Sequence, residues 1–217
     1  MTDLSKLSLA IERAFSWHKG VEYGCGLSMT NQLNGTANAI DQFYTGSDKK
    51  DILITALLSK AWEASRQNEI TKNNPQSRTS YEALVEDFGN SIADNIKALS
   101  TEPDTKDWHE IAMWASKQNQ QVQTVLLAEK LQNFIVSRDR PNPKKSPDWH
   151  INYYNTRMIV VEALREACPA LYVECVKVSE QGLKTQKRNL FEITNGGQRK
   201  VPSFEKIYMS NHDNGRI

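Results

Sequence analysis

The chain has 217 residues, with 27 lysines and arginines against 26 aspartates and glutamates. This length suffices for one domain with a substantial core, and the near-neutral charge argues against a dedicated nucleic-acid binder, which normally carries a basic excess. The sequence has no apolar run of about 18 residues that would predict a membrane span, and its start does not predict a secretion signal. Its three cysteines form no CxxC pair, which argues against a disulfide scaffold or a structural zinc site. We therefore expect a cytoplasmic protein that requires no cofactor.

Helical spacing of apolar residues dominates the chain up to about residue 181. Leucine, isoleucine and phenylalanine side chains recur every three or four positions from about residue 4 to residue 15, which predicts a first helix. The glycine-rich residues 20–35 predict a structured loop, and the polar residues 67–77 predict an exposed one. Further helices are predicted over residues 51–66, 80–88, 91–99, 108–136 and 149–181.

The pattern changes after Gly182. The sequence predicts a short β-hairpin, with strands over residues 190–193 and 200–208 and a turn at Asn195-Gly196-Gly197. The last 35 residues also carry seven lysines and arginines against three acidic residues, a net charge of +4.

The expected organisation is therefore an all-α helical bundle over residues 1–182, followed by a basic extension over residues 183–217. The edge of the predicted hairpin is a candidate surface for homo-oligomer formation.

Four segments, in this order and spacing, resemble the HD-domain alarmone hydrolases of the RelA/SpoT type, and the small single-domain members in particular. They read AFSWHKG at residues 14–20, ITALLSKAWEAS at 54–65, YEALVEDFG at 81–89 and VLLAEKLQN at 125–133. The corresponding family patterns are A-x-x-x-H-x-G-Q, A-L-L-H-D-x-x-E-D-T, I-x-x-x-F-G and K-L-A-D-R-L-x-N. The resemblance covers about residues 5 to 180 and implies an HD-domain helical bundle.

The metal positions of that family are replaced in this chain. In the family an HD dyad, a second histidine and a distant aspartate hold one divalent cation, typically manganese, which activates water for attack on a pyrophosphate. Here Ser59 and Lys60 stand at the dyad, Gln32 at the second histidine and Glu129 at the aspartate. The resemblance thus implies a degenerate site that holds no metal and has no catalytic residues.

Lys60 is the most informative of these replacements. If the fold is kept, its ammonium group should lie where the family holds its cation, close to Glu129. A fixed positive charge can supply part of the electrostatic role of a metal, but it cannot lower the pKa of a bound water as a divalent cation does. Lys60 either holds a charged ligand or only neutralises Glu129, and the sequence leaves both alternatives open.

Several positions that surround the substrate in the family keep a suitable side chain. Glu63 matches a family glutamate, Asn133 matches the asparagine near the nucleotide sugar, and Tyr23 falls where a base-stacking arginine would be. His18 matches a histidine that braces the family fold. The cationic candidates for binding phosphate groups are Lys19, Lys60, Arg138 and Arg140.

The sequence supports three hypotheses about function. The first is a pseudoenzyme that binds a purine or cyclic nucleotide signal and sequesters or senses it, as a phage sponge against nucleotide-based defence would. The second is a metal-dependent pyrophosphohydrolase of the ppGpp type with a non-standard site. The third is a protein-binding module that takes no nucleotide.

Overall fold

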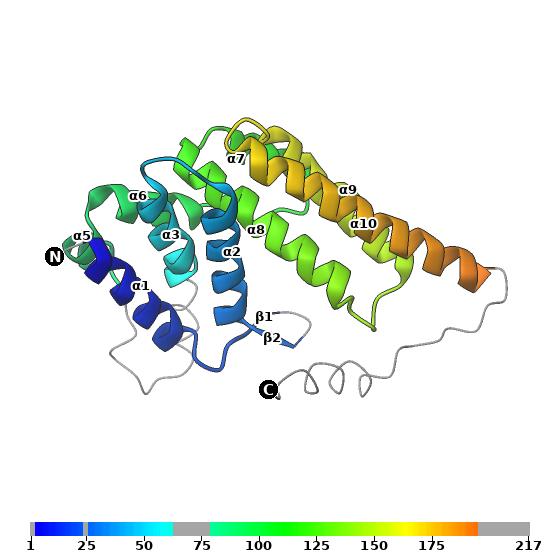
Figure 1. Cartoon of the computed structure of the whole chain (residues 1–217), viewed down its shortest axis with the longest axis horizontal. Coiled ribbons are helices and arrows are strands. Elements are labelled where there is room, and N and C mark those ends of the chain that lie inside the picture. The colour runs from blue at the N-terminus through cyan, green and yellow to red at the C-terminus, as the bar shows by residue number, and fades with distance from the viewer. Residues whose placement is uncertain (1–2, 24–25, 63–78, 195–217) are drawn as a thin grey trace, which may run out of the picture.

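The computed structural model describes residues 3–23, 26–62 and 79–194, and these form an all-α bundle with one short antiparallel strand pair (Figure 1). The helices are α1 (Asp3–Trp17), α2 (Met29–Phe43), α3 (Lys49–Leu58), α5 (Tyr81–Phe88), α6 (Asn90–Leu99), α7 (Trp108–Ser116), α8 (Gln120–Asp139), α9 (Pro147–Ala163) and α10 (Pro169–Thr194). The strands β1 (Glu22–Tyr23) and β2 (Leu27–Ser28) pair between α1 and α2. The predicted all-α fold class is thus confirmed.

Polar side chains fix the start of several helices. Ser28, Ser80, Asn119 and Ser146 each accept a hydrogen bond from the backbone N–H three residues further on, at 3.0 to 3.2 Å. Such caps satisfy N–H groups that have no partner within the helix, which stabilises a helix by about 1 kcal/mol. They set the positions at which α2, α5, α8 and α9 begin.

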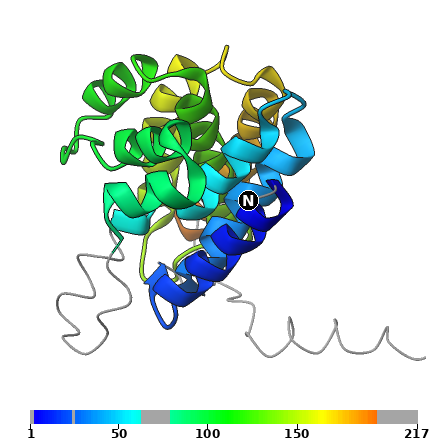
Figure 2. The ribbon, with the colours of Figure 1, turned by 90° about the vertical axis from the view of Figure 1, so that its left-hand side faces the viewer.

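Helix α8 runs through the middle of the molecule between two groups of helices (Figure 1). One apolar core joins α8 to α7, α9 and α10, and the other joins α1, α5 and α6. Helices α2 and α3 contribute side chains to both cores, and Figure 2 shows α1 packed across this end of the bundle. Residues on α2, α3 and α8 therefore meet in the interior, between the two cores.

Both long helices expected from the sequence are in fact pairs. The predicted helix 108–136 breaks where Asn119 caps α8, which separates α8 from α7. The predicted helix 149–181 breaks after Ala163, and Pro169 begins α10, a position at which the missing backbone N–H of proline costs no helical hydrogen bond. The continuous apolar pattern across each break reflects burial of both members of a pair in the same core.

The first half of the chain also departs from the expectation in two places. The predicted loop 20–35 contains the strand pair and the first two turns of α2. Gly35 lies within that helix and not in a turn. A Cβ atom on Gly35 would overlap the side chain of Gln132 on α8, so the glycine serves close helix packing and not a turn. The predicted helix 51–66 begins at Lys49 and is interrupted by a turn at residues 59–60. Residues 61–62 are helical again, and residues 63–66 lie outside the described residues.

The predicted change of structure at Gly182 is wrong for the described residues. Helix α10 continues through Gly182 to Thr194, so residues 190–193 are helical and not the first strand of a hairpin. The rest of that predicted hairpin and the predicted loop 67–77 lie outside the described residues. Of the helices that the structure describes, none combines the length and the apolar character needed to cross a membrane.

Candidate functional site

Helix α8 places Glu129 and Asn133 on one face, four residues apart. Glu129 is buried, with only 9% of its surface exposed. The Nζ atom of Lys60, from the turn that follows α3, lies 3.9 Å from Glu129 Oε2. The two side chains that the sequence expected to meet are therefore brought together in the interior.

Asn133 lies one helical turn from Glu129 and receives two hydrogen bonds on one atom. Its Oδ1 accepts from the hydroxyl of Tyr23 at 2.9 Å and from Nε2 of Gln32 at 2.8 Å. Tyr23 comes from β1 and Gln32 from α2, so this one carbonyl oxygen joins three elements that are distant in the sequence. Four of the candidate residues thus form one cluster: Tyr23, Lys60, Glu129 and Asn133, with Gln32 beside them.

The charges of the cluster determine which groups are ionised. Burial alone would raise the pKa of Glu129, but the positive charges of Lys60 and then Lys130 outweigh it and lower that pKa below its ordinary value. Burial raises the pKa of Tyr23, and the negative charge of Glu129 raises it further. Glu129 is therefore a carboxylate at neutral pH, and Tyr23 is a neutral phenol whose hydroxyl donates a hydrogen bond to Asn133.

Two buried polar groups near this cluster lack a partner among the described residues. They are the ring of His18, through both of its nitrogens, and the Oε1 atom of Gln32. Burial, followed by the positive charge of Lys60, lowers the pKa of His18 to about 4, so its ring is neutral at physiological pH. Unpartnered buried polar atoms are uncommon in folded proteins.

Helix α9 supplies two residues to this region that the sequence analysis missed. The guanidinium of Arg157 lies 3.8 Å from the ring centre of Tyr153 and 4.2 Å from that of Trp108 on α7. Burial raises the pKa of Tyr153, and the nearby Glu129 contributes to that rise. Intervals of four residues place Trp149, Tyr153 and Arg157 on one face of the helix, so that aromatic and cationic groups lie together. This spacing is a signal in the sequence, and it is overlooked when the helix is interpreted only as part of the apolar core.

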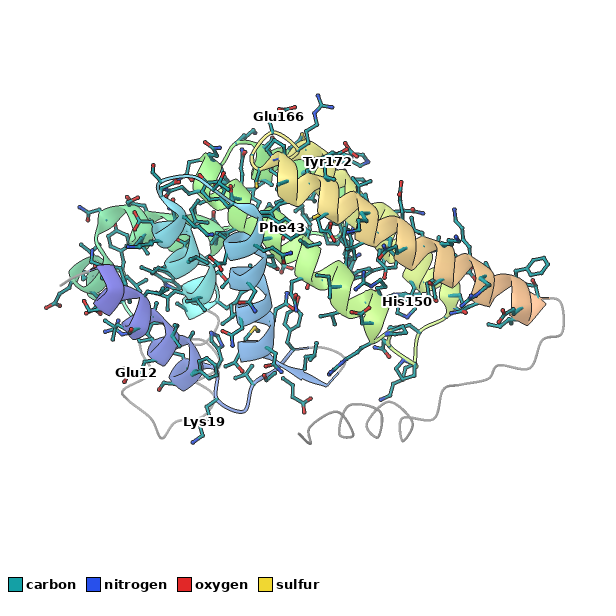
Figure 3. All side chains as sticks on the ribbon, in the orientation of Figure 1. Glu12, Lys19, Phe43, His150, Glu166 and Tyr172 are labelled. Carbon is teal, nitrogen blue, oxygen red and sulfur yellow. The ribbon has the colours of Figure 1, made fainter. Side chains whose placement is uncertain are left out.

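Three of the cationic candidates lie away from the cluster. Lys19 is exposed after α1 and projects from the molecule (Figure 3). Arg138 lies nine residues after Glu129, about 13 Å further along α8 and half a rotation around it. Its guanidinium donates to Asp139 and to Gln181 on α10. Arg140 is exposed at the end of the same helix.

Ser59 is the remaining predicted metal position that the structure describes. The Ser59 hydroxyl donates to the carbonyl of Ala56 at 2.9 Å within its own chain segment, and Glu63 lies outside the described residues. In the ranges 3–23, 26–62 and 79–194 there is no group of three histidine, cysteine, aspartate or glutamate side chains that could hold a metal ion. Glu129 already faces an ammonium group, so these residues do not fit the divalent cation of the resembled family.

Neither a family model nor a curated protein matches the chain. Among solved structures the chain is similar to a metazoan ortholog of SpoT that hydrolyses ppGpp, with a TM-score of 0.64 and 16% sequence identity. The match covers 82% of this chain and 97% of that structure. The fold is an HD-domain helical bundle. At this level of identity the comparison supports the fold and leaves the activity open.

Proposed function

We propose that this HD-domain protein binds a purine signalling nucleotide, and sequesters or senses it, without hydrolysing it through a bound metal. The observation that carries the proposal is the 3.9 Å separation of Lys60 Nζ and Glu129 Oε2. These residues stand at positions which, by resemblance, hold the metal in the hydrolases. An ammonium group cannot coordinate a metal, but it can attract a phosphate group.

The charges around the pair support an anionic ligand. Lys60 and Lys130 both lie close enough to lower the pKa of Glu129, and the guanidinium of Arg157 lies beside Tyr153. Positive groups therefore outnumber the carboxylate in this part of the described structure. The neutral ring of His18 and the Oε1 atom of Gln32 add polar groups that have no partner among the described residues.

The test is a capture-and-release assay with linear and cyclic purine signalling nucleotides, with and without manganese. The protein is incubated with each nucleotide, the free pool is removed by filtration, and the protein is heated to release its contents for mass analysis. Depletion followed by release of the intact nucleotide supports the proposal. The matched variants are Lys60→Met, which removes the central cation, and Lys117→Met, which removes an exposed lysine before the start of α8. Only the first is expected to abolish capture.

A second candidate function is metal-dependent pyrophosphohydrolysis, which is favoured by the activity of the similar metazoan protein. Release of a cleaved product in the presence of manganese would establish it and overturn the proposal. If no nucleotide is depleted under any condition, the remaining candidate is a protein-binding module, and the search moves to protein partners.

A further inference from the structure

A surface hollow lies beyond the C-terminal end of α8, whereas Glu129 lies in the middle of that helix. It has a volume of about 540 Å³ and lies between the α8–α9 connection and the end of α10. Its apolar walls include Pro143 and Pro147 on one side and Leu190 and Ile193 on the other. Figure 3 places His150, near the start of α9, at the same end of the molecule. The hollow is thus separate from the proposed nucleotide site.

The surroundings of the hollow are apolar enough to favour an occupant. Ile193 is 42% exposed, and Trp149, which follows the lining residues on α9, is 39% exposed. Pockets of about 300–1,000 Å³ are typical of specific binding sites, so the hollow has room for several side chains. Lys144, Lys145 and Asp148 also line it, which leaves one positive charge in excess, and the ammonium of Lys145 lies 5.3 Å from the ring centre of Trp149. An occupant with an apolar anchor and a neighbouring carboxylate would suit both features.

The chain itself supplies such a segment directly after this hollow. Another 23 residues follow Thr194, and their sequence carries Val201, Phe204, Ile207 and Tyr208 at spacings of three to four. Glu205 stands beside Phe204. Phe204 stands eleven positions after Ile193, which allows a reach of up to about 35 Å. That reach is ample to return to a hollow that Ile193 itself lines.

We infer that residues 201–208 of the same chain occupy this hollow, with Phe204 as the apolar anchor and Glu205 facing Lys144. The covalent connection favours this occupant over any free partner, because a short tether gives an effective concentration in the millimolar range. The hollow also borders the start of α9, where Trp149 stacks on Tyr153 with ring centres 5.3 Å apart. An occupant of the hollow would therefore fix in place the stacked rings of Trp149 and Tyr153, which lead along α9 toward Arg157.

The test is disulfide trapping in the full-length chain. In a Cys25→Ser background, the remaining cysteines Cys168 and Cys175 are buried. The pair Lys144→Cys and Glu205→Cys is then oxidised mildly, and the linked peptide is quantified by mass spectrometry in the monomer fraction. The matched control pair is Lys117→Cys and Glu205→Cys, since Lys117 is an equally exposed lysine at the opposite end of α8.

We expect the first pair to link at least about tenfold more than the control pair, as tethered docking predicts. Addition of Phe204→Asp should return the yield to that of the control. Equal yields for the two pairs, or no effect of Phe204→Asp, would overturn the inference. A disulfide found only in dimers, with a yield that rises with protein concentration, would overturn it as well and assign the hollow to the extension of a second copy.

Discussion

The ammonium of Lys60 and the carboxylate of Glu129 are both largely shielded from water, with side-chain exposures of 17% and 12%. Removal of one partner from such a pair leaves an uncompensated buried charge, whereas replacement of both by apolar groups is often neutral. Lys60→Met is therefore expected to lower the free energy of unfolding by about 3 kcal/mol, as measured by urea denaturation. The double variant Lys60→Met/Glu129→Leu should recover most of that loss.

The same variants separate stability from ligand binding. The double variant is expected to fold stably and still fail to capture a nucleotide, because the cation is absent. Glu129→Gln keeps the ammonium group and should keep capture. Capture by the stable double variant would contradict the phosphate role of Lys60 and leave it only the role of neutralising Glu129.

Asn133 is the second residue whose substitution gives a specific prediction. Asn133→Ala removes the acceptor of both the Tyr23 hydroxyl and the Gln32 amide. Two partly buried donors without acceptors should lower the free energy of unfolding by about 2–3 kcal/mol. The control is Asn155→Ala, an exposed asparagine of α9, for which a change within about 0.5 kcal/mol is expected. Equal effects of the two substitutions would show that the hydrogen bonds to Asn133 contribute little.

The sequence predicted the centre of this cluster better than its edge. The proximity of Lys60 and Glu129 followed from the register of the four resembling segments, and the structure confirms it. The charge of Arg138 is the only sequence signal for its predicted role, and the rotation of α8 turns it toward Gln181. Arg157 was missed because a cation on a helix with many apolar residues is usually solvated, whereas this one is held between two aromatic rings. The nucleotide roles of all these residues stay predictions.

At the scale of the elements, Gly182 shows how a helix interior can require glycine. A Cβ atom at this position would overlap the ring of Tyr154, which is fully buried on α9. Gly182→Ala is expected to lower the free energy of unfolding by up to about 2 kcal/mol, because overpacking costs about 1–3 kcal/mol and helix propensity returns only about 1 kcal/mol. The measurement is chemical denaturation, with Lys184→Ala on the exposed side of α10 as the control.

A second variant tests the cause of that loss. Tyr154→Ala creates room for the added methyl group, so Gly182→Ala should be less harmful in that background than in the native chain. Additive effects of the two substitutions would mean that the α9–α10 contact does not explain the glycine.

The helix boundaries show what apolar spacing predicts and what it omits. It correctly indicated α1, α5 and α6, each of which is one helix with one buried face. It merged α7 with α8 and α9 with α10, since a shared core continues the apolar pattern across a break that only a cap or Pro169 reveals. It also ended α10 too early, because a glycine selected by the ring of Tyr154 has the same sequence signal as a helix stop.

At the scale of the whole molecule, the two apolar cores meet at the polar cluster. Helices α2 and α3 belong to both cores, and Gln32 and Lys60 extend from α2 and from the turn after α3 toward α8. In the folded protein the surroundings of Glu129 and of His18 lower the pKa of each below its ordinary value. The unfolded chain has no such surroundings, so a change of pH acts on its stability through these groups.

His18 gives the last prediction, which concerns the pH dependence of folding. Its pKa is about 4 in the folded protein, because of burial and then the charge of Lys60, against 6.5 in the unfolded chain. Between these values the unfolded chain binds more protons, so stability is fully present above pH 6.5 and falls as the pH drops toward 4. A shift of this size corresponds to a loss of about 3 kcal/mol.

His18→Leu should reduce the slope of stability against pH in this window, whereas the exposed His109→Leu should leave it unchanged. At neutral pH the His18→Leu change should be small, because neither ring nitrogen has a hydrogen-bond partner among the described residues. Urea denaturation at pH 4.5, 5.5, 6.5 and 7.5 measures both effects, and equal slopes in all three proteins would contradict a neutral, buried His18.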